Sequence, residues 1–399
     1  MRIAMVGPFG FHPNKTMRSR ALGLARPLAA RGHQVQIIMP PWQTPAEADK
    51  RWQEDGVLVR NVSLAGGLPG ITRRLVREVL DWQPDVVHCF KPKAYSGLTA
   101  WWLWQFHRRD VRLVVDSDDW EGWGGWNDLA PYSAAQKHFF AWQERWGMTH
   151  CHALTVASRA LQTLAWGHGV PPDRVAYVPN GTGIRTQLAD THERGSGSDG
   201  EAAPTVLLYS RLFEFETGRL VAALRGVKTA VPTLRILAVG AGLYDADAAQ
   251  FCQQLAEVDL LDAVEDVGWV EEEALPALLS RADVGLYLME DTLLNRAKCP
   301  VKLADMLALG IPVVGEAVGQ VSEYVRHGQT GLLRPSGDTA GLTADLVYLL
   351  TEPEERARMA GNGRRHYAEN FAWSRLADRL ECVYKDGRPE ADFSPISNL

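Results

Sequence analysis

The chain has 399 residues, of which 46% are hydrophobic, and a formal net charge of −6 at pH 7. A chain of this length exceeds a single ordinary core, so we expect two domains. The negative net charge argues against a general nucleic-acid-binding protein, which would carry a basic surface. The five cysteines show no Cys-x-x-Cys spacing, which indicates reduced thiols and neither a zinc site nor a disulfide framework.

No apolar run is long enough to span a bilayer, and the apolar run at the N-terminus is too short for a signal peptide. We therefore expect a cytoplasmic protein.

Apolar runs and helical patterns alternate through the first half of the chain, as expected of a parallel sheet covered by helices. The loop after the first run contains Gly7 and Gly10, where the missing side chains would let the backbone approach a phosphate. We predict a doubly wound domain over residues 1–185. Its strands are expected at Ile3–Val6, Val35–Met39, Val57–Val62, Asp85–His88, Val111–Val115, Ala153–Ala157 and Val175–Val178, and its first helix at about Arg18–Ala30.

A second run of alternating elements follows a polar stretch rich in glycine and serine, Glu193–Gly200. This stretch has no apolar period, so we predict a flexible loop over residues 186–204 near the domain boundary. A second doubly wound domain is expected over residues 205–372, and a final amphipathic helix within 373–399. The strands expected in the second domain include Thr205–Ser210, Arg235–Val239, Ala282–Leu288 and Ile311–Val314.

The stretch from Lys298 to Gly315 predicts a binding site for a nucleoside-diphosphate sugar. Pro300 suits the first turn of a helix and Gly310 its end, before an apolar strand. Such a helix start offers unpaired N–H groups and the positive end of the helix dipole, which suit a diphosphate. Lys298 and Lys302 add positive charge there, and Asp305, one turn into the helix, could accept a hydrogen bond from a sugar hydroxyl.

This stretch resembles the nucleotide-binding signature of the family-4 retaining glycosyltransferases. In that family a glutamate is followed, after seven residues, by a second glutamate and then by a helix that ends in glycine. Asp305 falls on the second acidic position, whereas the first falls on Ala297. Pro179–Gly181 and the segment Gly328–Leu333 also resemble family motifs, so the resemblance covers most of the chain.

The resemblance implies a GT-B fold, in which two Rossmann-like domains with parallel sheets face one another across a cleft. It implies transfer of a sugar, with retention of configuration, from a UDP- or GDP-sugar to a hydroxyl of a saccharide or lipid-linked acceptor. No metal and no further cofactor are expected. The first domain would bind the acceptor and the second the donor, while the C-terminal helix would pack back on the first domain. The alternatives are a sugar phosphorylase, a nucleotide-sugar epimerase or a non-catalytic nucleotide-sugar-binding protein.

The resemblance also assigns the donor site residue by residue. Arg211, at a strand end, matches an arginine that binds the diphosphate, for which a guanidinium is well suited. The lysine that should follow five residues later is replaced by Glu216, so Lys298 or Lys302 must supply that charge. Trp269 matches the position whose backbone meets the base in the family, although its side chain could equally belong to the core. The residues predicted to bind the donor are Gly10, Arg211, Trp269, Lys298, Pro300, Val301, Lys302, Asp305 and Glu323.

The segment Asp116–Trp126 is unusually rich in acids and tryptophans. Asp118 and Asp119 stand where many relatives have a His-Asp pair. One of them could accept the proton of the acceptor hydroxyl, the cluster could bind a divalent metal, or the loop could recognise the acceptor with its carboxylates and tryptophan faces. We favour the first and third readings, and predict Asp118, Asp119, Arg211 and Lys302 as the catalytic residues.

Two further features leave alternatives open. His88 matches a histidine of the family, but a residue packed at a strand end fits equally well. The segment Trp101–Arg109 is aromatic and then basic. It could rest in the inner face of a membrane and bring the enzyme to a lipid-linked acceptor, or it could be a helix buried against the sheet.

Overall fold

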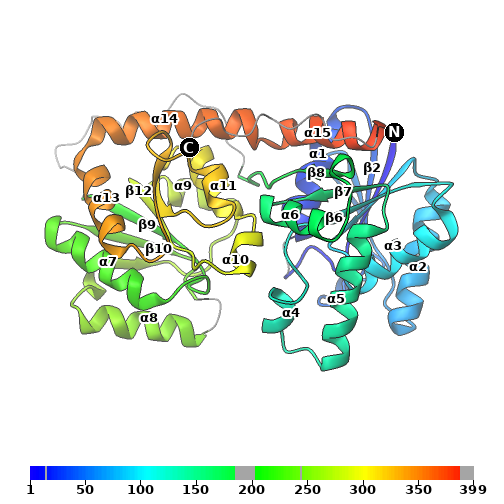
Figure 1. Ribbon diagram of the computed structural model, residues 1–399, viewed down its shortest axis with the longest axis horizontal. Coiled ribbons are helices and arrows are strands. Elements are labelled where there is room, and N and C mark those ends of the chain that lie inside the picture. The colour runs from blue at the N-terminus through cyan, green and yellow to red at the C-terminus, as the bar shows by residue number, and fades with distance from the viewer. Residues whose placement is uncertain (14–15, 185–202, 243–244, 387–399) are drawn as a thin grey trace. The chain divides into compact units, whose positions relative to one another are not determined.

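The computed structural model describes residues 1–13, 16–184, 203–242 and 245–386. The loop predicted at 186–204 therefore lies almost wholly outside the described residues. The chain forms two compact units (Figure 1), each with its own sheet and its own core. The predicted α/β class with two mainly parallel sheets is confirmed. Unit 1 contains the described residues of Met1–Gly181, Arg296–Cys299 and Ala372–Leu399, and unit 2 those of Thr182–Asn295 and Pro300–Phe371.

Unit 1 is built on an eight-stranded sheet in the order β3-β4-β2-β1-β5-β6-β7-β8. All neighbouring strands are parallel except β3 and β4, which pair antiparallel. The short strand β3 was not predicted, because it is half exposed and lacks an apolar run. The strands are β1 (Arg2–Val6), β2 (Gln34–Met39), β3 (Arg51–Glu54), β4 (Val57–Asn61), β5 (Val86–Phe90), β6 (Arg112–Ser117), β7 (Ala153–Val156) and β8 (Val175–Tyr177).

The helices of unit 1 cover both faces of this sheet, which explains why its central strands read as continuous apolar runs. The N-terminal end of α1 is extended by one π-helical segment, η1. The helices are η1 (Met17–Ala21), α1 (Leu22–Ala30), α2 (Gly67–Trp82), α3 (Ala94–His107), α4 (Trp126–Leu129), α5 (Ala134–Thr149), α6 (Arg159–Gly167) and α15 (Trp373–Asp386), with 3₁₀ turns η2 (Pro45–Glu47) and η3 (Pro172–Arg174).

Unit 2 is built on a six-stranded parallel sheet in the order β11-β10-β9-β12-β13-β14. The strands are β9 (Thr205–Tyr209), β10 (Arg235–Val239), β11 (Val264–Asp266), β12 (Val284–Tyr287), β13 (Val313–Glu316) and β14 (Gly331–Arg334).

Its helices are α7 (Thr217–Ala230), α8 (Asp245–Glu257), α9 (Leu275–Leu279), α11 (Val301–Leu309), α12 (Val321–Tyr324), α13 (Thr339–Thr351) and α14 (Pro353–Asn370), with the 3₁₀ turn η4 (Leu261–Ala263), while α10 (Leu293–Ala297) spans the boundary between the units.

In both sheets the strand order reverses beside the first strand of the unit, between β1 and β5 and between β9 and β12. In doubly wound folds, ligands bind outside the carboxyl ends of the strands at this reversal. The carboxyl ends of β1, β5 and β6 are adjacent in the register of unit 1. Those of β9, β12 and β13 are adjacent in unit 2. Functional side chains are therefore expected at these two edges.

The C-terminal helix α15 packs on α1 within unit 1. Leu376 and Leu380 are fully buried in the core of that unit. Gly23 of α1 provides the space for this contact, because a Cβ at Gly23 would lie 2.5 Å from the indole ring of Trp373. At the edge of the contact, Arg31 forms ion pairs with Asp378 at 2.7 Å and Glu381 at 3.1 Å.

Because Gly23 lies so close to the Trp373 ring, we expect a larger side chain at this position to lower the stability of the protein. Gly23→Ala should lower the free energy of unfolding by about 1–3 kcal/mol, because the added methyl forces the Trp373 ring out of place. Gly167→Ala is the matched control, since a Cβ at Gly167 of α6 has no neighbour within 4 Å. It should leave stability unchanged or raise it by up to about 1 kcal/mol. Thermal unfolding of both variants measures this, and equal midpoints would contradict the packing role of Gly23.

Candidate functional site

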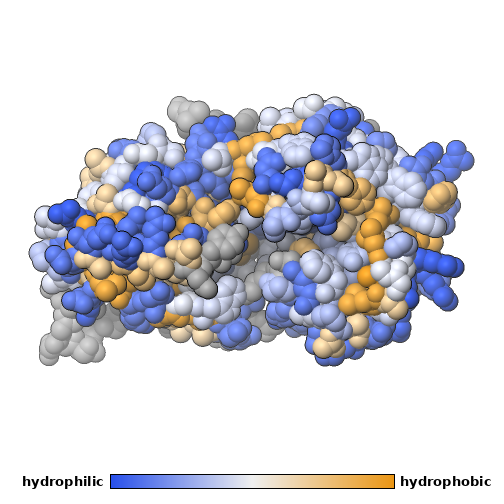
Figure 2. Space-filling model, turned by 90° about the horizontal axis from the view of Figure 1, so that it is seen from below, coloured by the Kyte–Doolittle hydropathy of each residue, from blue (hydrophilic) through white to orange (hydrophobic). Residues whose placement is uncertain are grey.

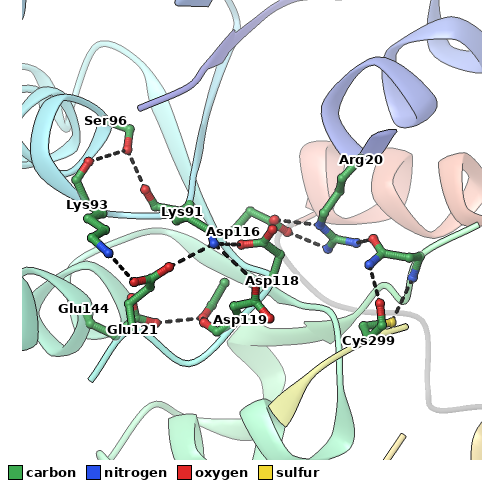
Figure 3. Close-up of polar contacts among 12 residues, drawn as sticks. Arg20, Lys91, Lys93, Ser96, Asp116, Asp118, Asp119, Glu121, Glu144 and Cys299 are labelled. Carbon is green, nitrogen blue, oxygen red and sulfur yellow. Dashed lines mark hydrogen bonds and ion pairs between the residues drawn. The ribbon is translucent and has the colours of Figure 1, made fainter. Parts of the chain in front are cut away.

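The carboxyl edge of the unit 1 sheet is organised around a buried ion pair (Figure 3). Arg20 of η1 donates from Nε and Nη2 to the two carboxylate oxygens of Asp116, both at 2.7 Å. Both side chains are buried. Arg20 also donates to Asn180 Oδ1 at 2.9 Å, and Asn180 in turn donates to the carbonyl oxygen of Cys299 at 2.9 Å. This bidentate pair fixes the position of the end of β6, where the loop that carries Asp118, Asp119 and Glu121 begins.

His88 belongs to the core of unit 1. Its Nδ1 lies 2.8 Å from the Tyr384 hydroxyl and its Nε2 lies 3.0 Å from the Thr155 hydroxyl. Complete burial holds the pKa of His88 well below its usual range, so the ring is neutral at physiological pH. Of the two interpretations of His88, the structure supports a packed residue that ties α15 to the sheet.

The loop after β6 brings Asp118, Asp119 and Glu121 around the ammonium group of Lys91, as Figure 3 shows. Lys91 Nζ lies 2.9 Å from Glu121 Oε1, 3.3 Å from Asp119 Oδ2 and 3.7 Å from Asp118 Oδ1. Lys93 binds the second oxygen of Glu121 at 2.5 Å. The position that a cation would take among these carboxylates is thus occupied by an ammonium group. Among the residues that the structure describes, no three His, Cys, Asp or Glu side chains are arranged to hold a metal.

The carboxylates of this cluster differ in their electrostatic environments. Burial opposes ionisation of Glu121, but the neighbouring charges of Lys91 and Lys93 outweigh it and lower the pKa of Glu121. Burial raises the pKa of Asp119, against the opposing charge of Lys91. Burial also raises the pKa of Glu144 of α5 to about 8, so this side chain is largely protonated at neutral pH. Glu144 accepts a hydrogen bond from Ser117 at 2.8 Å.

The two candidate catalytic aspartates differ in access. Asp118 is buried, and its Oδ1 has no hydrogen-bond partner among the described residues. The side chain of Asp119 is 26% exposed. Of the two aspartates, Asp119 is therefore the more exposed to solvent.

The tryptophans of the same loop take different positions. Trp120 is buried and stacks on His168 with ring centroids 5.9 Å apart. Trp123 is exposed. Lys298 is buried in unit 1, with its ammonium group 5.3 Å from the centre of the Trp126 ring. Its charge also acts on Asp119. Lys298 and Lys302, which we predicted to serve one diphosphate, thus belong to different units.

Gly10, in the loop after β1, is buried. A Cβ at Gly10 would lie 3.2 Å from Cβ of Pro41. The absence of a side chain therefore allows close packing on the loop after β2. The approach of this backbone to a donor phosphate stays a prediction.

In unit 2 the predicted donor residues gather at the end of β9 and the start of α11. Arg211 donates to Glu214 Oε1 at 3.1 Å, and its side chain is partly exposed. The ammonium group of Lys302 lies 4.7 Å from the centre of the Tyr209 ring. Tyr209, Glu214 and Lys302 line a small pocket together with Ser210 and the end of β12. Pro300 is the N-cap of α11 and makes no side-chain cap hydrogen bond, and Val301 and Lys302 are the first two residues of the helix.

Asp305 lies deeper than its predicted contact with a sugar hydroxyl requires. It is buried, and its carboxylate accepts hydrogen bonds from the hydroxyls of Thr182 and Tyr209. Burial raises the pKa of Asp305 to about 7, although these hydrogen bonds act in the opposite direction. In the described structure Asp305 therefore fixes Tyr209 beneath Lys302, and its contact with a donor stays a prediction.

The remaining predicted donor residues lie on loops and at a helix start in unit 2. The side chain of Trp269 is 68% exposed, so the alternative that it belongs to the core is wrong. Glu323 lies in the first turn of α12 and is half-buried, and its carbonyl oxygen accepts from His366 Nε2 at 2.9 Å. At the position where the family has a sugar-binding glutamate, Ala297 is buried, and its carbonyl oxygen accepts from Ser158 at 2.7 Å.

Lys91, Lys93 and Glu144, which lie beside the carboxylates of the loop after β6, were not predicted as site residues. The two lysines could have been predicted, because Lys91-Pro-Lys93 closely follows a predicted strand, where functional side chains of this fold lie. Glu144 lies within a long aromatic helix, and no sequence pattern there indicates a functional role.

Comparisons with known proteins agree with this architecture. The sequence profile described as "Glycosyl transferase 4-like domain" matches residues 15–181, and that described as "Glycosyl transferases group 1" matches residues 203–352. A phosphatidyl-myo-inositol mannosyltransferase from Mycobacterium leprae is 25% identical over 96% of each chain. A glycogen synthase from Mycobacterium tuberculosis is 26% identical over 76% of this chain and 69% of its own length.

Solved structures show the same fold. Sucrose-phosphate synthase from Thermosynechococcus elongatus superposes with a TM-score of 0.72, at 18% identity over 96% of this chain and 98% of that one. Anabaena HepE in complex with UDP and glucose superposes with a TM-score of 0.67, at 17% identity over 96% of this chain and 99% of that one.

The two matched profiles together span most of the chain, and the structural neighbours extend the likeness over both units. The chain belongs to the group 1, family-4 glycosyltransferases of the GT-B fold, and it is a retaining, nucleotide-sugar-dependent glycosyltransferase.

Proposed function

We propose that this enzyme takes a hexosyl group from a UDP- or GDP-sugar bound by unit 2 and transfers it to an acceptor hydroxyl bound by unit 1. The observation that carries the donor assignment is the pair of cations at the carboxyl edge of the unit 2 sheet. Arg211 stands at the end of β9, and Lys302 stands in the first turn of α11. Positive charge and the positive end of a helix dipole are what a leaving diphosphate requires.

Lys302 is the better replacement for the family lysine that Glu216 displaces. Lys298 is engaged in unit 1 by the Trp126 ring and the field of Asp119. Arg219, one turn into α7, is bound to the buried carboxylate of Glu316 at 2.5 Å. Lys302 instead faces the small pocket at the end of β9. We assign Arg211 and Lys302 to the diphosphate, and the helix start at Pro300 and Val301 to the same group.

For the acceptor we assign Asp119 as the group that accepts the hydrogen bond of the attacking hydroxyl. Its carboxylate is partly exposed at the strand reversal of unit 1, and burial raises its pKa toward the range useful for a base. Asp118 supports it from behind. Among the relatives are a phosphatidyl-myo-inositol mannosyltransferase and a D-inositol 3-phosphate glycosyltransferase. These names support a saccharide, polyol or lipid-linked acceptor.

Removal of either cation in unit 2 should weaken nucleotide binding. A thermal-shift screen of UDP, GDP and ADP first identifies the best nucleotide, because a bound ligand stabilises the folded protein. Arg211→Ala and Lys302→Ala should each then weaken its binding by roughly 1.5–3 kcal/mol, the scale of a hydrogen bond to a charged group. Calorimetry measures the change, with the exposed Arg225→Ala of α7 as the matched control. Wild-type affinity in both variants would remove the diphosphate assignment.

Neutralising the aspartates of unit 1 should slow chemistry without affecting the donor. Asp119→Asn or Asp118→Asn should lower kcat by about 10²-fold or more, the lower range for loss of a general base. Donor affinity should stay nearly unchanged, because these residues belong to unit 1. Asp173→Asn, on an exposed turn of the same unit, is the control. Wild-type rates in both variants would leave the acceptor base unassigned. A loss of donor affinity would instead mean that this loop reaches the sugar.

We further propose that the surface formed by α3 and α5 rests on an anionic membrane at its inner face. No helix in the described part of the chain is long and apolar enough to cross a bilayer. Trp102 and Phe106 of α3 and Trp142 of α5 are nevertheless exposed. Figure 2 shows one face of the molecule, on which hydrophobic residues lie among hydrophilic ones. Arg109 and Arg145 are exposed on the same elements or at their ends. Aromatic side chains flanked by cations suit the headgroup region of an anionic bilayer.

Vesicle sedimentation tests this surface. The wild type should bind vesicles of phosphatidylcholine with phosphatidylglycerol more strongly than vesicles of phosphatidylcholine alone. The double variant Trp102→Ser, Phe106→Ser should bind the anionic vesicles roughly fivefold or more weakly, because two apolar contacts are lost. Trp166→Ser is the matched control, since Trp166 of α6 is 41% exposed and Trp102 is 39% exposed. No vesicle binding by the wild type, or equal losses in the variant and the control, would contradict the proposal.

A further inference from the structure

Lys91 is held at the strand reversal of unit 1 by its own backbone. It directly follows β5 and has a φ of 48°, in the left-handed region that is unfavourable for a residue with a Cβ. Its N–H donates to the carbonyl oxygen of Asp116 at 2.8 Å. Its carbonyl oxygen accepts from Ser96 Oγ at 2.5 Å and from the N–H of Lys93 at 2.6 Å. These three hydrogen bonds offset the cost of the conformation and fix where the side chain starts.

The ammonium group of Lys91 has three donors, and three carboxylates surround it. Glu121 is the shortest contact, at 2.9 Å, but Glu121 is also held by Lys93. Asp119 at 3.3 Å and Asp118 at 3.7 Å complete the shell. The nearby carboxylates outweigh burial and keep the pKa of Lys91 well above its usual range. The ammonium group of Lys91 is therefore charged at neutral pH.

Without this charge the carboxylates would repel one another in a buried site. Asp118 and Glu121 raise the pKa of Asp119, whereas Lys91 and Lys298 lower it. Behind Glu121 lie the second lysine, Lys93, and the buried acid Glu144, and Arg20 faces Asp118 from η1. Of the two cations that favour ionised Asp119, Lys91 also forms a direct hydrogen bond with it.

We propose that Lys91 is a positioning residue for the transfer reaction, which orients the Asp119 carboxylate toward the acceptor hydroxyl and pairs with its negative charge. This inference rests on the proposed role of Asp119 as the acceptor of that hydroxyl's hydrogen bond. Lys91 touches neither substrate in this assignment and acts through Asp119. Lys93 stands two residues away but binds Glu121 and lies over the rings of Tyr132 and Phe140. It therefore offers a matched comparison.

The test is the pH dependence of kcat in the full-length enzyme. Lys91→Met should lower kcat at neutral pH by about tenfold or more. It should also move the acid limb of the profile upward by about one pH unit or more, since an opposite charge at this distance shifts a carboxyl pKa by about 1–3 units. Lys91→Arg should restore part of the rate and return the acid limb toward its wild-type position. Lys93→Met should leave that limb in place, and donor affinity should be unchanged in all three variants.

The outcomes separate this inference from the function on which it rests. Wild-type rates in Asp119→Asn would overturn the role of Asp119. Loss of activity in Asp119→Asn together with a wild-type rate and acid limb in Lys91→Met would overturn the role of Lys91 alone. An equal shift of the limb in Lys93→Met would reduce Lys91 to a general contributor of charge and overturn the specific assignment. If Lys91→Met does not fold, Lys91→Gln removes the charge, keeps a hydrogen-bond donor and makes the same prediction.

Discussion

A fully buried ion pair between Arg20 and Asp116 supports the rest of the unit 1 site. Removing two charges from water is costly, and the cost is recovered only when the pair is well aligned and its remaining donors are satisfied. Here the pair is bidentate, and Arg20 also donates to Asn180. Asn180 in turn donates to the carbonyl oxygen of Cys299, the residue before Pro300. The Arg20 guanidinium therefore holds the end of β6 directly and, through Asn180, the segment that precedes α11.

The two units differ in how their charged side chains are paired. In unit 1 Lys91 and Lys93 form ion pairs with the carboxylates of the loop after β6. Among these carboxylates, Asp119 is partly exposed, and burial raises its pKa. In unit 2 Lys302 lies over the Tyr209 ring and Arg211 donates to Glu214. This difference in charge is the physical basis on which we propose a base in unit 1 and a leaving-group site in unit 2.

The central strands of both sheets could be predicted because parallel strands covered on both faces require continuous apolar sequence, as in β1 and β5. The half-exposed edge strand β3 lacks such a run and could not. The predicted end of the donor helix was also right, since Gly310 adopts φ of 70° at the C-cap of α11. Contacts between distant residues could not be predicted. Lys91 meets the acidic loop 28 residues later, and Thr182 meets Asp305 123 residues later. The separation of Lys298 from Lys302 likewise depends on which unit the segment Arg296–Cys299 joins.

The departures from the family pattern make physical sense together. Ala297, which the resemblance places at the first acidic position of the family, is buried, and its carbonyl oxygen accepts a hydrogen bond from Ser158. In the same unit, Lys298 lies close enough for its charge to lower the pKa of Asp119. The segment around Ala297 thus carries a lysine that favours the ionised form of Asp119. Among Asp118, Asp119 and Glu121, Asp119 is also the most exposed, and this supports our proposal that the base lies on the loop after β6.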